Sequence, residues 1–151
     1  MKHGIYYSYW EHEWSAKFGP YVEKVAKLGF DVIEVAAHHI NEYSDAELAE
    51  IRRTATDNNI VLTAGIGPSK SKNLSSPDIA VRQAGKAFFE QTLTNVAKLD
   101  IKTIGGALHS YWPVDYSKPV DKEGDRARGV EGITALRISP PTWELTSASK
   151  S

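Results

Sequence analysis

Cysteine is absent from all 151 residues of the chain. Its absence excludes disulfides, thiolate chemistry and cysteine-based zinc sites, and it fits a reducing cytoplasm. Long hydrophobic runs are also missing, since none approaches the roughly 20 consecutive apolar residues of a membrane span. The opening residues, MKHGIYYSYWEHEW, lack the apolar core of a signal peptide. We therefore expect a cytoplasmic protein with no membrane partner.

Charge of one sign is not in excess either. The chain has 18 Lys and Arg against 19 Asp and Glu, a formal net charge of -1, and the two signs are mixed along the sequence. Without a basic stripe, nothing favours nucleic acid or anionic lipid. Hydrophobic residues make up 41% of the chain, which is ordinary for a globular domain that buries its own core. We predict no nucleic-acid partner.

What the chain does contain is a strand–helix pattern, repeated over residues 1–132. Short β-rich runs alternate with runs whose apolar residues recur at helical spacing. Ser44 and Glu47 form the S-x-x-E capping box that begins the second helix. From about Ile133 the pattern stops, and the remaining residues show neither an apolar period nor capping residues. Strands are expected at 3–9, 30–36, 60–64 and 101–104, and helices at 15–28, 44–59, 76–99 and, as a start that does not complete, 126–132.

This alternation predicts right-handed βαβ units and a parallel sheet. A doubly wound open sheet would want a glycine-rich phosphate turn after the first strand, but residues 7–10 are Tyr-Ser-Tyr-Trp. A (β/α)₈ barrel instead places functional residues at the carboxyl ends of successive strands. Here aromatic, histidine and glycine residues follow the strands. We therefore predict an α/β fold of the parallel (β/α) TIM-barrel type, with about four of the eight units present.

Aromatic residues gather after the first and fourth strands. Aromatic faces suit the C–H face of a sugar, but large aromatics also close one end of an ordinary core. Their position after strands favours the sugar slot. Gly65 and Gly67 permit a close approach of backbone to a ligand, although a simple turn explains them equally well. The four aromatic residues are Tyr6, Trp14, Tyr111 and Trp112.

Several titratable residues lie near the same strand ends. They could serve as metal ligands or general bases, but no H-x-x-x-H or H-E-x-x-H spacing occurs. Glu34, inside an apolar strand, needs a partner, and a cation, a hydroxyl or a helix lysine would each serve. The sequence leaves all these roles open. The residues are His12, Glu13, Glu34, His38, His39 and His109.

Whole segments of the chain resemble one enzyme family. They are similar to the N-terminal half of the ketose 3-epimerases of the D-tagatose 3-epimerase family. That family includes the D-psicose (D-allulose) 3-epimerases and belongs to the xylose-isomerase-like TIM barrels. The resemblance runs from Met1 to about Gly132. The segments that carry it are MKHGIYYSYWEHEW, FDVIEVAAHHINEYSDAEL, LTAGIGPSK, GKAFFE and IGGALHSYWPVDYSKPVDK.

The resemblance implies a metal-dependent enzyme, usually with Mn²⁺ or Co²⁺, that inverts carbon 3 of a ketohexose. It would interconvert D-fructose and D-psicose, or D-tagatose and D-sorbose. One carboxylate would remove the proton to give a cis-enediolate, and a second carboxylate on the opposite face would return a proton. The metal would hold the oxygens of carbons 2 and 3. Transferred by motif, the residues that would line the sugar pocket are Tyr6, Trp14, Gly65, Ala107 and Trp112.

The family's catalytic glutamates and metal ligands lie in the second half of its barrel and have no counterpart here. The resemblance thus implies no catalytic residue and no metal ligand in this chain, and no specific binding of Mn²⁺ or Co²⁺. We divide the chain into residues 1–132, the N-terminal half of a barrel, and residues 133–151, an irregular tail outside the family pattern. A frameshift followed by a premature stop would produce such a tail, which the DNA sequence of this region tests.

The functional expectation is therefore a truncated ketose 3-epimerase. By family the chain is an isomerase, but we expect it to be inactive alone and to bind a ketohexose weakly. Exposed half-barrel edges predict self-association. The alternative is a non-catalytic sugar-binding or interaction module of the same barrel family. A different xylose-isomerase-like enzyme would bring more histidine and carboxylate ligands than this sequence has.

Overall fold

The computed structural model describes residues 1–11 and 17–136. Predictions for His12, Glu13, Trp14, Ser15 and residues 137–151 lie outside the described residues. None of the helices in the described ranges combines the length and the apolar character that crossing a bilayer requires.

A four-stranded parallel sheet is the centre of the fold. The strands lie side by side in chain order, and all neighbours are parallel. Tyr6 pairs with Glu34, and Glu34 with Thr63, so these residues lie in one row across the sheet. Order and direction confirm the predicted βαβ units. The strands are β1 (Gly4–Tyr6), β2 (Val32–Ala36), β3 (Val61–Ile66) and β4 (Ile104–Gly106).

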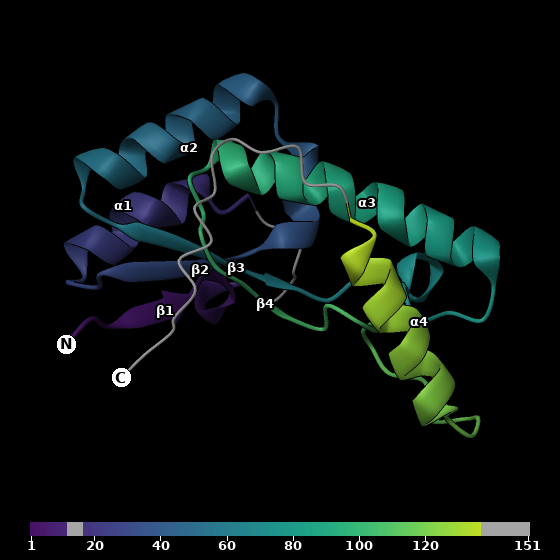
Figure 1. Ribbon diagram of the computed structural model, residues 1–151. Helices are drawn as coiled ribbons and strands as arrows, with labels where there is room; N and C mark the ends of the chain where they lie inside the picture. Colours follow the sequence, from purple (N-terminus) through teal and green to yellow (C-terminus); the bar gives the residue numbers. More distant parts are fainter. Residues whose placement is uncertain (12–16, 137–151) are drawn as a thin grey trace, which may run out of the picture.

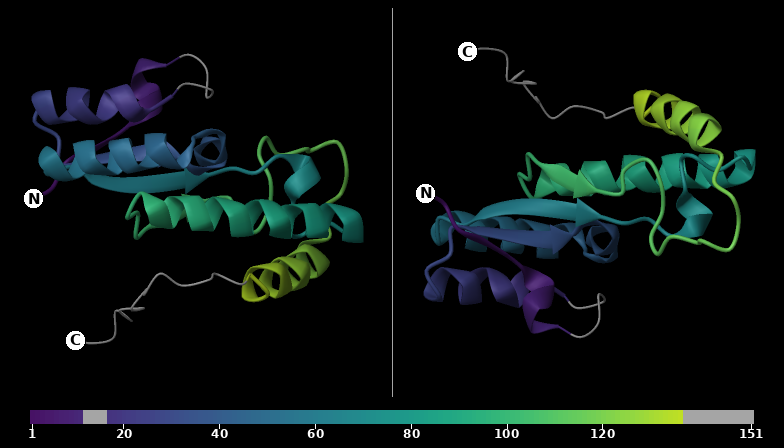
Figure 2. Two further views of the ribbon diagram at one scale, coloured as in Figure 1. Left: turned by 90° about the horizontal axis from the view of Figure 1, so that it is seen from above. Right: turned by 90° about the horizontal axis from the view of Figure 1, so that it is seen from below.

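Helices cover one face of this sheet. Helices α1 (Gly19–Lys27), α2 (Asp45–Asp57) and α3 (Ile79–Lys98) connect successive strands and pack on that face (Figures 1 and 2). No described helix covers the opposite face. Helix α4 (Lys122–Thr134) follows β4 and lies beside α3 (Figure 2). Short 3₁₀ helices follow the first three strands: η1 (Tyr7–Trp10), η2 (Ala37–Glu42) and η3 (Lys70–Lys72).

The core lies between the sheet and helices α1 to α3. Burial alternates along β2, where Ile33 and Val35 are fully buried and Glu34 between them is exposed. Such alternation is expected where helices cover only one face of a sheet. Glu34 therefore points to the uncovered face, and its carboxylate stays out of the apolar core.

The capping box of α2 is confirmed. The backbone N–H of Glu47 donates to the Ser44 hydroxyl at 3.3 Å, and the backbone N–H of Ser44 donates to the Glu47 carboxylate at 2.8 Å. Two N–H groups that a helix start leaves unpaired are thus satisfied reciprocally. Lys17 reaches the same carboxylate at 2.5 Å, which ties the segment before α1 to the start of α2.

Two predicted elements in the first unit have wrong boundaries. The strand predicted over 3–9 ends at Tyr6, and the next residues form η1. The reason lies in Tyr7, which is fully buried and packs its ring against Phe18 and Tyr21. Helix α1 begins at Gly19 with Pro20 in its first turn, so Lys17 and Phe18, predicted as helical, precede the helix.

The last unit also differs from its prediction. Strand β4 lies at Ile104–Gly106 and not at 101–104, because Gly105 and Gly106 pair with Gly65 and Ile66 of β3. Helix α4 is a complete 13-residue helix that begins at Lys122, not an aborted one at 126–132. Its few apolar residues hid the helical period. The Asp121 carboxylate caps it by accepting the N–H of Gly124 at 3.1 Å.

Candidate sugar-binding site

A cavity of about 680 Å³ opens at the carboxyl ends of the four strands. It lies where a (β/α) barrel keeps its functional residues. Four of the five residues predicted to line a sugar pocket meet here: Tyr6, Gly65, Ala107 and Trp112. Trp14 lies outside the described residues, and its role stays a prediction. The other lining residues are Glu34, His38, Ile66, Gly67, Gly106 and Pro113.

The floor of the cavity joins the ends of the first three strands. A Cβ atom at Gly65 would lie 3.0 Å from the Glu34 carboxylate and 3.5 Å from the Tyr6 ring. Any larger residue at position 65 would therefore displace one of these side chains. Because Gly65 has no side chain, the Glu34 carboxylate and the Tyr6 phenol can lie close together on the floor of the site.

Two titratable groups of the cavity, Tyr6 and His38, have shifted pKa values. Burial, assisted by the charges of Tyr7 and Glu34, raises the pKa of Tyr6 to about 12. Burial, assisted by the neighbouring His39, lowers the pKa of His38 to about 4. Desolvation disfavours the charged form in both cases. Near neutral pH the cavity therefore presents a neutral phenol and a neutral imidazole.

The tautomer of His38 follows from its surroundings. Its Nδ1 atom is buried and has no hydrogen-bond partner in the described part of the chain. A neutral imidazole carries one N–H proton, and on Nδ1 this N–H would be a buried donor without an acceptor. We therefore assign the proton to Nε2, which leaves His38 with one N–H donor.

The wall of the cavity comes from the loop after β4. Trp112 donates its backbone N–H to the carbonyl of Pro68 at 2.8 Å. A Cβ atom at Gly67 would lie 3.1 Å from the Trp112 Cβ, so the two backbones are in close contact. The Trp112 residue is 62% exposed. A largely open aromatic ring beside a cavity is available to pack against a ligand.

An ion pair connects the loops after β3 and β4 near this wall. Lys70 Nζ lies 2.6 Å from the Asp115 carboxylate, and the Tyr111 hydroxyl accepts the N–H of Asp115 at 3.3 Å. The hydrogen bond from Lys70, aided by Ser117, holds the pKa of Asp115 well below its usual range. Tyr111, predicted as part of the aromatic slot, thus joins this contact instead of the cavity lining.

Two described histidines, His39 and His109, lie outside the cavity lining. His39 pairs its Nδ1 with the Glu42 carboxylate at 2.7 Å, and the carbonyl of His109 accepts from the Ser75 hydroxyl. No three His, Asp or Glu side chains gather in a cluster that could hold a metal, as far as residues 1–11 and 17–136 are concerned. The described residues thus do not fit the Mn²⁺ or Co²⁺ of the resembled family.

Comparisons with known proteins bear on the fold and on this site. Residues 22–138 match the xylose isomerase-like TIM barrel family. The chain belongs to this family. It is 84% identical over 136 residues to a D-psicose 3-epimerase of Agrobacterium fabrum, a match that covers 90% of this chain and 47% of that relative. The chain therefore spans about half the length of the curated relatives it matches.

Solved structures agree. A D-psicose 3-epimerase determined in the presence of D-fructose is 86% identical and superposes with a TM-score of 0.85, covering 88% of this chain and 46% of its own. A D-psicose 3-epimerase from Clostridium cellulolyticum, determined with D-tagatose, is 53% identical with a TM-score of 0.86, covering 90% and 47%. The predicted TIM-barrel fold, with four strands of it described here, and the resemblance to D-psicose 3-epimerases are confirmed.

Sequence reasoning did not find every lining residue. Ile66 and Pro113 were missed, because both were assigned to loops. Pro113 follows Trp112 directly, and Ile66 lies between the two glycines of the G-x-G segment. Attention to the immediate neighbours of the predicted residues would have found both.

Proposed function

We propose that the chain forms the sugar-binding half of a ketose 3-epimerase barrel and that its cavity holds a ketohexose without converting it. The observation that carries the proposal is the meeting of Tyr6, Gly65, Ala107 and Trp112 around one cavity at the strand ends. D-fructose and D-tagatose accompany two similar structures, which supports a ketohexose as the ligand.

The side chains of the cavity suit a polyhydroxylated ring. The faces of Trp112 and Tyr6 can pack against C–H groups. The His38 Nε2–H can donate to a sugar oxygen, and the Glu34 carboxylate can accept from a sugar hydroxyl. The volume of about 680 Å³ falls within the roughly 300–1,000 Å³ of small-molecule sites. Because the cavity is open, we expect binding no tighter than about millimolar.

Turnover needs more than this cavity supplies. Inversion at carbon 3 requires one group to remove a proton from one face and another to return it to the opposite face. Among the lining residues, Glu34 is the one carboxylate. We propose that the full-length relatives interconvert D-fructose and D-psicose, or D-tagatose and D-sorbose, through a cis-enediolate. The described residues of this chain form no cluster of His, Asp and Glu that fits a metal ion.

Ligand-detected NMR with D-psicose and no metal tests the binding half of the proposal. We expect saturation transfer to the sugar in the parent chain and its loss in Trp112→Ala. Tyr116→Ala serves as the matched control, because Tyr116 is an aromatic of the same loop that is 86% exposed and outside the cavity lining. Equal binding by all three proteins would contradict the proposal.

The same purified protein tests the catalytic half. Incubation with Mn²⁺ and D-fructose is expected to yield no D-psicose above the level of a mock purification from the host. Interconversion by material free of host epimerase would overturn the assignment of an inactive half.

We also propose that the chain self-associates with a second copy of itself. In the described part of the chain, β1 and β4 end the sheet, and each leaves one row of backbone groups without a neighbouring strand. Apolar side chains stay exposed nearby, with Val61 at 42% on the uncovered face and Ile133 at 40% on α4. A two-fold arrangement would place β4 of each copy beside β1 of the other, all parallel.

Sedimentation velocity across a dilution series tests this association. We expect a dimer or larger species at high concentration that shifts toward monomer on dilution. A monodisperse monomer with a single cooperative melting transition at every concentration would contradict it.

A cytoplasmic location is part of the proposal. It is supported by the absence of cysteine from the chain, which fits a reducing compartment.

A further inference from the structure

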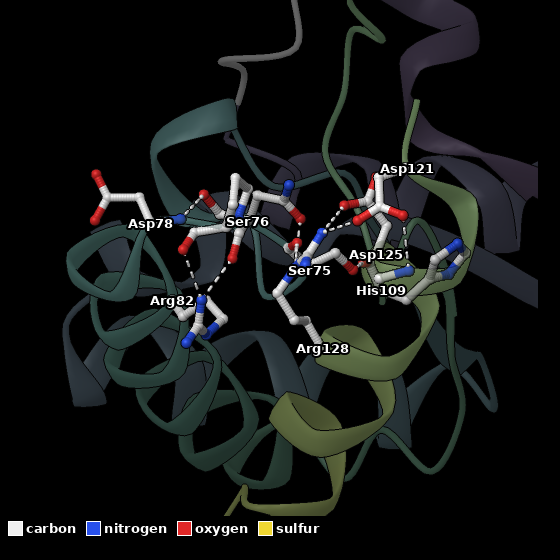
Figure 3. A network of polar contacts seen from close by, with 11 residues as sticks. Ser75, Ser76, Asp78, Arg82, His109, Asp121, Asp125 and Arg128 are labelled. Carbon is white, nitrogen blue, oxygen red and sulfur yellow. Dashed lines mark hydrogen bonds and ion pairs between the residues drawn. The ribbon is translucent and has the colours of Figure 1, made fainter. Parts of the chain in front are cut away.

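A polar network outside the cavity lining joins three segments that are distant in sequence. Arg128 of α4 donates its Nε–H to the backbone carbonyl of Ser75 at 2.8 Å (Figure 3). Its Nη2 contacts the Asp125 carboxylate at 2.6 Å and the Asp121 carboxylate at 3.4 Å. The two carboxylates hold the guanidinium in place, so its third contact is fixed in direction.

Ser75 carries the connection onward. It is 1% exposed, and its hydroxyl donates to the backbone carbonyl of His109 in the loop after β4 (Figure 3). Its own N–H is satisfied by the Asn73 side-chain oxygen at 2.9 Å. One buried residue therefore joins the loop after β3 to both α4 and the loop that carries Trp112.

The two loops meet at three points of different strength. Near the cavity Trp112 bonds to Pro68, and farther out Lys70 pairs with Asp115. The Lys70–Asp115 pair is solvated, because its side chains are 65% and 32% exposed, and such pairs contribute little. The third point is the hydrogen bond from the Ser75 hydroxyl to the His109 carbonyl. Arg128 holds Ser75 by a charge-assisted hydrogen bond that is better protected from solvent, since the Arg128 side chain is 23% exposed.

We propose that Arg128 is a positioning residue that holds Trp112 against the cavity by way of Ser75 and His109. Without the guanidinium, the buried Ser75 carbonyl loses its partner. An unpaired buried carbonyl is costly, so the 73–77 segment shifts toward water. That shift withdraws the Ser75 hydroxyl from His109, three residues before Trp112. The part of the proposal that concerns sugar affinity rests on the proposed function, whereas the placement of Trp112 does not.

Arg82 offers a matched control. From α3 its Nη1 donates to the carbonyls of Ser76 at 2.7 Å and Pro77 at 3.1 Å (Figure 3). It thus caps the same segment with the same chemistry, but its hydrogen bonds do not reach the loop after β4. Arg82→Ala removes an equivalent anchor while leaving the path to Trp112 intact.

The experiment uses ¹⁹F NMR of the chain labelled with 5-fluorotryptophan, with the Trp112 resonance assigned from Trp112→Phe. We expect Arg128→Ala to shift and broaden this resonance, and Arg128→Lys to do so in part, because one ammonium cannot replace the guanidinium fork. Arg82→Ala should leave the Trp112 resonance unchanged, although the melting temperature of this variant should fall by a similar amount. Affinity for D-psicose should drop about tenfold in Arg128→Ala alone, the loss expected for one charge-assisted contact.

An unmoved Trp112 resonance in Arg128→Ala, or an equal change in Arg82→Ala, would overturn the inference. Should Arg128→Ala not fold, Ser75→Ala takes its place, since it removes the bond to His109 and keeps the carbonyl for Arg128. A smaller change in the Trp112 signal is then expected, and no change overturns the inference. If the signal moves but no variant, nor the parent, binds D-psicose, the positioning role stands and the proposed function fails.

Discussion

Replacing Gly106 with alanine is expected to cost this protein several kcal/mol and to lower its melting temperature by about 10 °C. Gly106 has a φ of 103°, a conformation that residues with a Cβ atom rarely adopt. An added Cβ would also lie 2.3 Å from the backbone oxygen of Ile66. Backbone cannot move aside as a side chain can. The substitution must therefore open the last pair of β3 and β4.

The Gly106→Ala substitution should also disturb the lining of the cavity. The Ile66 oxygen that the new Cβ would strike accepts the N–H of Ala107 at 2.8 Å, and Ala107 lines the site. Gly105→Ala is the matched control, because nothing lies within 4 Å of a Cβ built there. Circular dichroism melting of both variants decides the matter. Equal melting temperatures would show that β4 tolerates a side chain at position 106.

The second large effect is expected for Phe18→Ala, which should destabilise the fold by about 3–5 kcal/mol. Phe18 is fully buried, and its ring lies 6.2 Å from that of Tyr7 and 4.9 Å from that of Tyr43. Its backbone N–H donates to the Tyr43 hydroxyl at 2.7 Å. A domain of this size has only about 5–15 kcal/mol of stability in total. The variant should therefore lose a large part of its free energy of unfolding.

Urea denaturation measures this loss. Tyr9→Ala removes a ring that is 76% exposed, and a surface change of this kind should alter stability by less than about 0.5 kcal/mol. A midpoint for Phe18→Ala within error of that for Tyr9→Ala would mean that the Phe18 side chain, at the N-cap of α1, is not part of the cooperative core.

Local signals were read correctly from the sequence. The capping box of Ser44 and Glu47 was predictable because both partners lie within one helical turn, and the structure shows both of its hydrogen bonds. The four strands and their parallel order followed from the alternation of β-rich and helical segments. The sequence also indicated the strand ends as the place for a site, because a (β/α) fold brings those ends together.

Contacts between segments distant in sequence could not be predicted from the sequence. Arg128 reaches Ser75 across 53 positions, and Ser75 reaches His109 across 34; no period or motif marks either pair. The register of β4 failed for a related reason. Gly105 and Gly106 have turn-like composition, and only their pairing with β3 makes them strand. Helix α4 was missed as a complete helix because its stability comes from its cap and its polar contacts, not from an apolar stripe.

The uniform direction of the four strands has a consequence for gene duplication. All four strands run in the same direction, so the two edge strands, β1 and β4, match in direction when a second copy follows the first. In a tandem repeat, β1 of the second copy is therefore a compatible parallel neighbour for β4 of the first, with no strand reversed.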